Sequence, residues 1–244
     1  MTKKLMTKKR WGILFTVLLC SCSGAKKDLT TDIGTMAEAD RLTRKEFYEE
    51  ARKQYFRIKT EFPQSPLQVE ADRKIADTYY NEESYTAAAT AYEDFIKTYP
   101  GRLEIPDVLY KLGLSYAKQM PRTSQRDTRA TSKAVDVFTR LMVDYPNNKY
   151  MTEAQEWIEK ARHQLAEKIF EIGRFYERKG QYDSAARRFA EVADQYADSP
   201  LVEESLSREI QDLKRSGQKE KAEEMAAKFL EKYPHSKFAS KIRK

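Results

Sequence analysis

An aromatic residue followed by proline recurs along this chain, and each copy precedes a polar break and a new amphipathic stretch. The pair occurs at Phe62-Pro63, Tyr99-Pro100, Tyr145-Pro146 and Tyr233-Pro234, with Tyr196-Ala197 as a degenerate copy. The prolines, with Ala197 in the place of one, lie 37, 46, 51 and 37 residues apart. Because proline cannot continue a helix, this spacing predicts helical units that end at regular intervals.

The residues between these breaks fit the tetratricopeptide (TPR) pattern, a pair of helices that repeats about every 34 residues. Three units carry an aliphatic residue, a small residue and a tyrosine, then an alanine with an aromatic residue four positions later. The small residue lets two helices approach closely, and the aromatic residues fill the space between them. The pattern residues are Ile75, Ala76, Tyr79, Ala88 and Tyr92; Leu112, Gly113, Tyr116, Ala134 and Phe138; and Ile172, Gly173, Tyr176, Ala185 and Phe189.

The first and last units follow the pattern less closely. Ala51 and Tyr55 precede Pro63, whereas Ala222 and Phe229 precede Pro234. Terminal repeats are expected to be atypical because one of their faces meets water. The predicted fold class is therefore all-α, a TPR superhelix of about five helix-turn-helix repeats with about ten helices.

Breakers and caps predict where these helices begin and end. Ser65-Pro66 and Ser199-Pro200 are each expected to be an N-cap followed by a first-turn proline. The third repeat has about a dozen extra residues between its two helices, judged against the repeat period. Helices are expected near 46–61, 66–81, 84–98, 105–119, 128–144, 150–179, 181–195, 200–215 and 218–232, with a broken helix before residue 44.

The stretch from 150 to 179 is unusual because it keeps one apolar helical face without a breaker. It is expected to be a helix near 45 Å long, about twice the usual TPR helix. We expect it to connect an N-terminal TPR block at 35–149 with a C-terminal block at 150–244 that also contains the basic tail.

The start of the chain predicts export. Five basic residues precede an apolar run, Trp11 to Leu19, that is too short to span a bilayer. The end of this run resembles a bacterial lipoprotein signal, in which a small residue stands before the lipidated cysteine. Cys22 follows Ser21 and fits this rule, whereas Cys20 follows the bulky Leu19 and is the less favoured alternative.

These residues predict a signal peptide at 1–21 and a lipidated flexible tether at 22–34. The covalent lipid on Cys22 is the only non-protein group expected. Ser23 is not aspartate, the residue that retains many proteobacterial lipoproteins in the inner membrane. We therefore expect attachment to the periplasmic face of the outer membrane.

Charge and composition exclude two other classes of protein. The formal net charge of +7 falls to about +2 without residues 1–21, which carry five basic and no acidic side chains. Such a balanced surface does not predict a nucleic-acid partner. The two histidines, His163 and His235, lack the neighbours of a metal site, and no catalytic motif is present. The chain is predicted not to be an enzyme and to bind no metal.

The mature sequence resembles the BamD family, the TPR lipoproteins of the outer-membrane β-barrel assembly (Bam) complex. The most specific similarity is Gln125-Arg126-Asp127 followed by the stretch from Tyr145 to Ala154, with Tyr176 to Gly180 further on. Ala197 departs from the family pattern because it replaces a repeat-ending proline, and the basic tail from Lys241 to Lys244 also departs from it.

The resemblance implies a scaffold with two kinds of partner. Family members hold the POTRA domains of the barrel-forming protein BamA through their C-terminal repeats, where Arg187 and Arg188 stand at the family's Asn-Arg pair. Their N-terminal repeats are proposed to receive the C-terminal targeting strand of unfolded outer-membrane proteins. Other Bam lipoproteins are further candidate partners.

The TPR register predicts which residues face such a targeting strand, because the first helix of each pair lines the concave surface. Aromatic and aliphatic side chains beside Arg and Lys suit an extended peptide that ends in an aromatic residue and a carboxylate. The candidates are Arg73, Asp77, Tyr80 and Asn81 in the second repeat, and Tyr110, Leu114 and Lys118 in the third.

The alternative is another periplasmic TPR adaptor lipoprotein that coordinates the cell envelope or cell division. Such adaptors usually carry a coiled coil before the repeats, and this sequence shows no heptad run. The lipoprotein signal and the stretch from Arg126 to Ala154 favour the BamD family.

Overall fold

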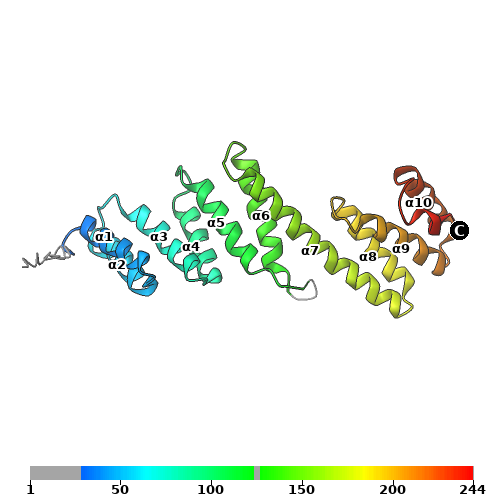
Figure 1. Cartoon of the computed structure of the whole chain (residues 1–244), viewed down its shortest axis with the longest axis horizontal. Coiled ribbons are helices and arrows are strands. Elements are labelled where there is room, and N and C mark those ends of the chain that lie inside the picture. Colours follow the sequence, from blue (N-terminus) through cyan, green and yellow to red (C-terminus); the bar gives the residue numbers. More distant parts are fainter. Residues whose placement is uncertain (1–28, 124–126, 244) are drawn as a thin grey trace, which may run out of the picture.

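The computed structural model describes residues 29–123 and 127–243. The predicted signal peptide and both cysteines lie outside these residues. Over the described ranges the chain forms eleven α-helices and no strand, arranged as an elongated array in chain order (Figure 1). The helices are α1 (Asp32–Arg44), α2 (Tyr48–Glu61), α3 (Gln68–Asn81), α4 (Tyr85–Thr98), α5 (Ile105–Lys118), α6 (Arg129–Asp144), α7 (Met151–Arg178), α8 (Tyr182–Gln195), α9 (Val202–Arg215), α10 (Lys219–Lys232) and α11 (Ala239–Ile242).

Each helix packs mainly against its neighbours in the chain, so that five pairs stack one after another from α1–α2 to α9–α10. This confirms the predicted five-repeat TPR superhelix of ten helices. The short α11 was not predicted. It covers the end of the last pair, where Ile242 packs with Ile210 and Phe229.

The prediction of a broken helix before residue 44 is wrong, because α1 is continuous from Asp32 to Arg44. The Oγ1 atom of Thr31 caps it by accepting a hydrogen bond from the backbone N–H of Gly34 at 3.0 Å. The predicted tether at 22–34 is consequently too long at its C-terminal end. Glycine and the sparse apolar residues of this stretch concealed the helix from the periodicity argument.

Ser65 and Ser199 do not cap α3 and α9 directly, so this prediction also needs correction. Their Oγ atoms accept hydrogen bonds from the N–H groups of Leu67 at 3.1 Å and Leu201 at 3.3 Å. Each serine therefore stabilises a turn that leads into the helix, which starts a residue after the leucine.

Short left-handed turns join the two helices of four repeats. Glu46, Glu83, Gly180 and Gly217 adopt φ values of 62°, 62°, 71° and 85°. In each turn the next residue's N–H bonds back to a carbonyl five residues earlier, which is the Schellman arrangement that ends a helix. Ten residues, 119–128, separate α5 from α6, against three residues in each of the other four repeats. The predicted insertion is therefore present, but it adds seven residues and not the dozen expected.

Glycine–phenylalanine contacts hold the paired helices of the third and fourth repeats together. A Cβ atom built on Gly113 would lie 2.5 Å from Cε1 of Phe138, and one on Gly173 would lie 2.8 Å from Cε1 of Phe189. Both phenylalanine rings are fully buried. The rings therefore occupy the space that a side chain would take, as the TPR register predicted.

Gly173→Leu should lower the free energy of unfolding by about 1–3 kcal/mol because the new side chain overpacks against Phe189. Urea unfolding followed by circular dichroism measures this change. Gly101→Leu is the matched control, since a Cβ atom there meets nothing within 4 Å. Equal stability of the two variants would contradict the assigned contact.

The long helix α7 connects the two halves of the array, as predicted. It contains 28 residues and packs against both α6 and α8. Ala154 and Ile158 belong to the core cluster of the second and third repeats, whereas Ala166 and Phe170 belong to the cluster formed with α8. Figure 1 shows α7 running diagonally from one half to the other.

Two carboxyl groups on α9 are buried without a full set of partners. Glu209 and Asp212 are 3% and 0% exposed, and one oxygen of each has no hydrogen-bond partner among the described residues. Burial raises the pKa of Glu209 to about 7, although Lys221 on α10 opposes this and Asp194 on α8 adds to it. Burial, with the Glu177 carboxylate on α7, raises the pKa of Asp212 to about 6.

These shifts predict that the folded state loses stability as the pH rises. The unfolded chain releases the Glu209 proton near pH 4.5, but the folded chain retains it until about pH 7. The contribution of Glu209 to the free energy of unfolding should therefore be greatest below pH 4.5 and should decrease as the pH rises from 4.5 to about 7.

Glu209→Gln should flatten this dependence and raise the free energy of unfolding at pH 8 by about 2 kcal/mol, because no buried charge forms. Urea unfolding at a series of pH values measures it. Glu223→Gln, at an exposed position on α10, should leave the parent's pH profile unchanged. The same slope in parent and Glu209→Gln chains would show that Glu209 titrates normally.

Candidate functional site

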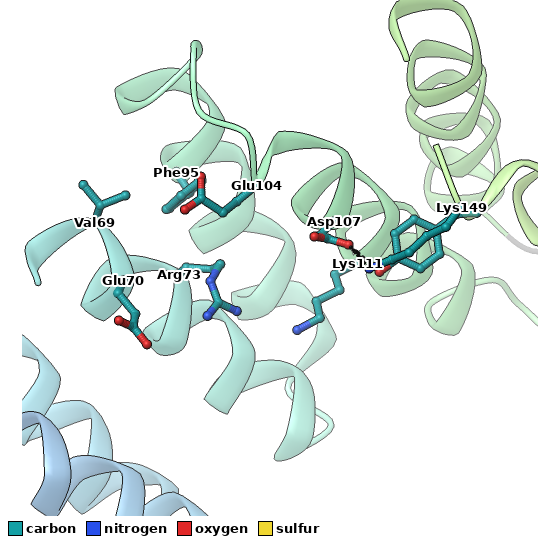
Figure 2. Close-up of a pocket in the computed structure, with 9 residues that line it drawn as sticks. Val69, Glu70, Arg73, Phe95, Glu104, Asp107, Lys111 and Lys149 are labelled. Atoms are coloured by element: carbon teal, nitrogen blue, oxygen red, sulfur yellow. Dashed lines mark hydrogen bonds and ion pairs between the residues drawn. The ribbon is translucent and has the colours of Figure 1, made fainter. Parts of the chain in front are cut away.

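The first helices of repeats one to three line two hollows that share Arg73. The hollow between α3 and α5 has a volume near 380 Å³ and is drawn in Figure 2. The hollow between α1 and α3 has a volume near 280 Å³ and is lined by Asp40, Tyr55, Lys74, Asp77 and Asn81 among others. The larger hollow is lined by Val69, Glu70, Arg73, Phe95, Glu104, Asp107, Lys111, Lys149 and Tyr150.

Asp77 is the charged centre of this surface. Its carboxylate accepts hydrogen bonds from Arg73 Nη1 at 2.8 Å, Lys111 Nζ at 2.7 Å and Tyr92 Oη at 2.6 Å. Burial, together with the Asp77 charge, raises the pKa of the Tyr92 hydroxyl, which therefore remains a hydrogen-bond donor. Asp77 thus connects the two helices of its own repeat with the first helix of the next repeat.

The first repeat contains the same arrangement around Asp40. Its carboxylate accepts hydrogen bonds from Lys74 Nζ at 2.6 Å and from Tyr55 Oη at 2.6 Å. Sequence reasoning missed this set. The signal was present, because each of its three members recurs 37 residues later, as Asp77, Lys111 and Tyr92.

The third repeat replaces the polar pair with an apolar one. Leu114 stands at the position of Asp77, one residue after the small residue of the pattern, and Phe138 stands at the position of Tyr92. Phe138 is fully buried, and Leu114 packs against the same core cluster. The hydroxyl group and its carboxylate acceptor are therefore lost together, and no buried hydroxyl remains unpaired there.

Asp77→Leu should cost about 1–3 kcal/mol of stability because it leaves the buried Tyr92 hydroxyl and two cations without their acceptor. The double change Asp77→Leu with Tyr92→Phe copies the third repeat. We expect it to cost less than the sum of the two single changes, measured as a double-mutant cycle by urea unfolding. Strict additivity would show that the two side chains act independently.

A second carboxylate network forms the far wall of the larger hollow. Asp107 accepts hydrogen bonds from Tyr150 Oη at 2.5 Å and Lys149 Nζ at 2.8 Å. Burial opposes ionisation of Asp107, but these two donors outweigh it and lower the pKa of its carboxyl group. The Tyr150 ring stacks on Tyr110 with centroids 3.9 Å apart and an interplanar angle of 6°.

The structure places three of the predicted groove residues together and separates the others. Arg73, Asp77 and Asn81 line the hollow between α1 and α3, and Arg73 also faces the larger one. Figure 2 shows Arg73 on α3 opposite Lys111 on α5 across the open space.

The remaining groove candidates have other surroundings. Tyr80 packs edge-to-face against Tyr85 at 5.5 Å, and burial raises the pKa of its hydroxyl group. Tyr110 supports the wall through its stack on Tyr150, and Leu114 packs on the core. Lys118 is exposed and lines a different hollow, beside α7.

The predicted partner-binding residues lie on the exposed side of α8. Arg188 pairs with Glu191 at 2.6 Å and keeps 45% of its side chain exposed, while Arg187 pairs with Asp183. Ala185 is fully buried, as the register requires. Both arginines are therefore available to a partner at the cost of one exposed intrahelical ion pair each.

Two further properties limit the chemistry of the described residues. They contain no group of three or more His, Cys, Asp and Glu side chains that could hold a metal ion. None of the helices described is both long and apolar enough to cross a membrane.

The stacked helical pairs and the open, charged hollows define this chain as a TPR scaffold with an extended surface. The family model described as "YfiO: Outer membrane lipoprotein" matches residues 34–228. The chain therefore belongs to the YfiO family of outer membrane lipoproteins.

Curated relatives carry the name outer membrane protein assembly factor BamD. The protein of Rickettsia prowazekii is 26% identical over 231 residues, which cover 93% of this chain and 92% of the relative. The protein of Neisseria gonorrhoeae is 28% identical over 180 residues, covering 70% and 67% of the two chains. These relatives are named as assembly factors, in agreement with the prediction that this chain is not an enzyme.

Similar solved structures include the TPR2AB domain of yeast Sti1 in complex with pHSP90. It is 16% identical, and the match covers 86% of this chain and 80% of that one with a TM-score of 0.44. The TPR protein YrrB is 19% identical with a TM-score of 0.36, and the match covers 88% and 93% of the two chains. Both TM-scores are below 0.5, so the description of the repeats is based on the helices of this chain alone.

Proposed function

We propose that this protein is a lipid-anchored scaffold of an outer-membrane β-barrel assembly complex. The observation that carries the proposal is the family match over residues 34–228, together with assembly-factor relatives that align along most of their length. The scaffold holds the POTRA domains of a BamA-like partner and supports insertion of β-barrel proteins. The family match favours this function over that of an unrelated periplasmic adaptor.

The hollows of the first three repeats are proposed to receive the targeting strand of an unfolded outer-membrane protein. Arg73 and Lys111 can pair with a terminal carboxylate, and the stacked Tyr110 and Tyr150 offer an aromatic wall nearby. Both cations already pair with Asp77. A client carboxylate would therefore compete with Asp77, which favours ligands that present several contacts at once.

The anchor is proposed to be a lipid on Cys22, with Cys20 as the less favoured site. Acyl chains supply most of the membrane affinity of such proteins, so the repeats need no apolar surface for attachment. We place the protein on the periplasmic face of the outer membrane. Other Bam lipoproteins remain candidate partners along the array.

The test is co-purification of the BamA-like partner from detergent-solubilised outer membranes. Arg188→Glu should reduce recovery of the partner about tenfold or more, because charge reversal places like charges together at the contact. Helicity should be unchanged, since an exposed intrahelical pair contributes only about 0.3–0.5 kcal/mol.

Arg140→Glu on α6 is the matched control, because Arg140 is 52% exposed and also pairs within its own helix, with Asp144. It should leave recovery of the partner unchanged. Equal recovery with both variants at low and high salt would remove Arg188 from the interface. Failure of the parent chain to recover any β-barrel assembly component would sink the proposed function itself.

A further inference from the structure

A third hollow lies where the insertion of the third repeat meets the long helix, and neither the groove nor the α8 surface includes it. Its volume is near 480 Å³, larger than either groove hollow and within the range of about 300–1,000 Å³ usual for ligand pockets. We call it the junction hollow. Its main walls are Lys118, Met120, Pro121 and Arg122 from the end of α5 and the following loop, with Trp157 and Lys160 from α7.

The basic side chains of the junction hollow have no acidic partner among the described residues. Lys118, Arg122 and Lys160 form no ion pair with any residue of the described ranges, in contrast to Arg73, Lys74 and Lys111 in the groove. Among the described lining residues Glu167 is the one acidic side chain, and it lies 3.5 Å from His163. Three unpaired cations around one concave surface repel one another and attract an anion.

Part of the lining of the junction hollow is apolar. Trp157 packs one part of its ring on the core cluster, and Lys160 lies over the ring with Nζ 4.7 Å from its centroid. Met120, Pro121 and Ala117 complete the apolar lining. A small inorganic anion would leave this surface exposed to water, so a ligand must supply an apolar group beside its negative charge.

Hydrogen bonds between the loop and α7 support the shape of the junction hollow. Gln164 donates its amide N–H to the backbone carbonyl of Pro121, and Thr131 on α6 donates to the Gln164 Oε1 atom at 3.2 Å. Lys168 donates to the Thr128 hydroxyl at 3.0 Å. The wall on the loop side is therefore fastened to the long helix at two points.

We propose that the junction hollow binds an acidic peptide segment, in which an aromatic side chain flanked by carboxylates packs against Trp157 while Lys118, Arg122 and Lys160 pair with the carboxylates. Charge complementarity carries this choice of occupant. The inference is independent of the BamA-like partner and of the client strand, because neither proposed site uses these residues.

Trp157 provides a direct reporter, because Trp11 is the chain's only other tryptophan. Trp11 lies in the predicted signal peptide at 1–21, so the processed lipoprotein keeps Trp157 as its one tryptophan. We would titrate this lipoprotein in detergent with the blocked peptide Asp-Glu-Phe-Glu-Asp. The expected result is a saturable change in indole emission. The neutral peptide Asn-Gln-Phe-Gln-Asn and the peptide Asp-Glu-Gly-Glu-Asp should each bind at least about tenfold more weakly, since one lacks charge and the other an aromatic ring.

Lys118→Glu and Lys160→Glu should each weaken binding of the acidic aromatic peptide about tenfold or more. Lys97→Glu on α4 carries the same charge change at an exposed position outside the hollow, and should bind like the parent. Circular dichroism checks that all variants keep their helicity. The comparison among peptides on the parent chain does not depend on how any of these variants fold.

Four outcomes would overturn the proposal. The first is the absence of a saturable change with the acidic aromatic peptide, and the second is equal binding of all three peptides. The third is equal binding by Lys118→Glu and Lys97→Glu chains. The fourth is a change in emission with phosphatidylglycerol vesicles but not with the peptide, which would assign the hollow to an anionic lipid surface.

Discussion

The close contact between an aromatic ring on one helix and a small residue on its partner is the constraint on which this structure depends. Phe138 and Phe189 lie so near Gly113 and Gly173 that no Cβ atom fits between them. This contact fixes how near the two helices of a repeat approach, and therefore where the residue next to the small one lies. In the second repeat that residue is Asp77, whose position beside the Tyr92 hydroxyl follows from the same packing.

The fold could be predicted from the sequence because it follows packing rules. Which charged side chains form ion pairs with one another could not be predicted. Local periodicity in the sequence was enough to predict the contact of Gly113 with Phe138 and the unbroken apolar face of α7. The pairing of Lys111 with Asp77 depends on how neighbouring repeats stack, and only the 37-residue recurrence would have revealed it. Lys118 was predicted beside Arg73, whereas it lines the hollow beside α7, because helical register alone does not show which hollow a residue at the end of α5 faces.

The two kinds of hollow differ in where their countercharges come from. In the groove, Asp40 and Asp77 neutralise the cations of the next repeat, so an anionic ligand gains affinity only by exchanging one carboxylate for another. Such an exchange adds little to affinity, but it favours ligands that fit the shape of the groove and make several contacts at once. Beside α7 the cations form no ion pair within the part of the chain that the structure describes. An anionic ligand there has no protein carboxylate to displace, so binding should depend more strongly on salt.

The continuity of α7 has a consequence for how the protein can vary. Residues 159–165 lie between the parts of α7 that belong to the two core clusters. One residue added or removed in this stretch would shift the helical phase by about 100° and the axial position by about 1.5 Å. The surface that carries Arg188 would then point in a new direction relative to the groove. The buried Ala161 and the Gln164 bonds to Pro121 and Thr131 would be displaced as well. Length changes should therefore be excluded from the middle of α7, where residue number sets the angle between the two binding surfaces.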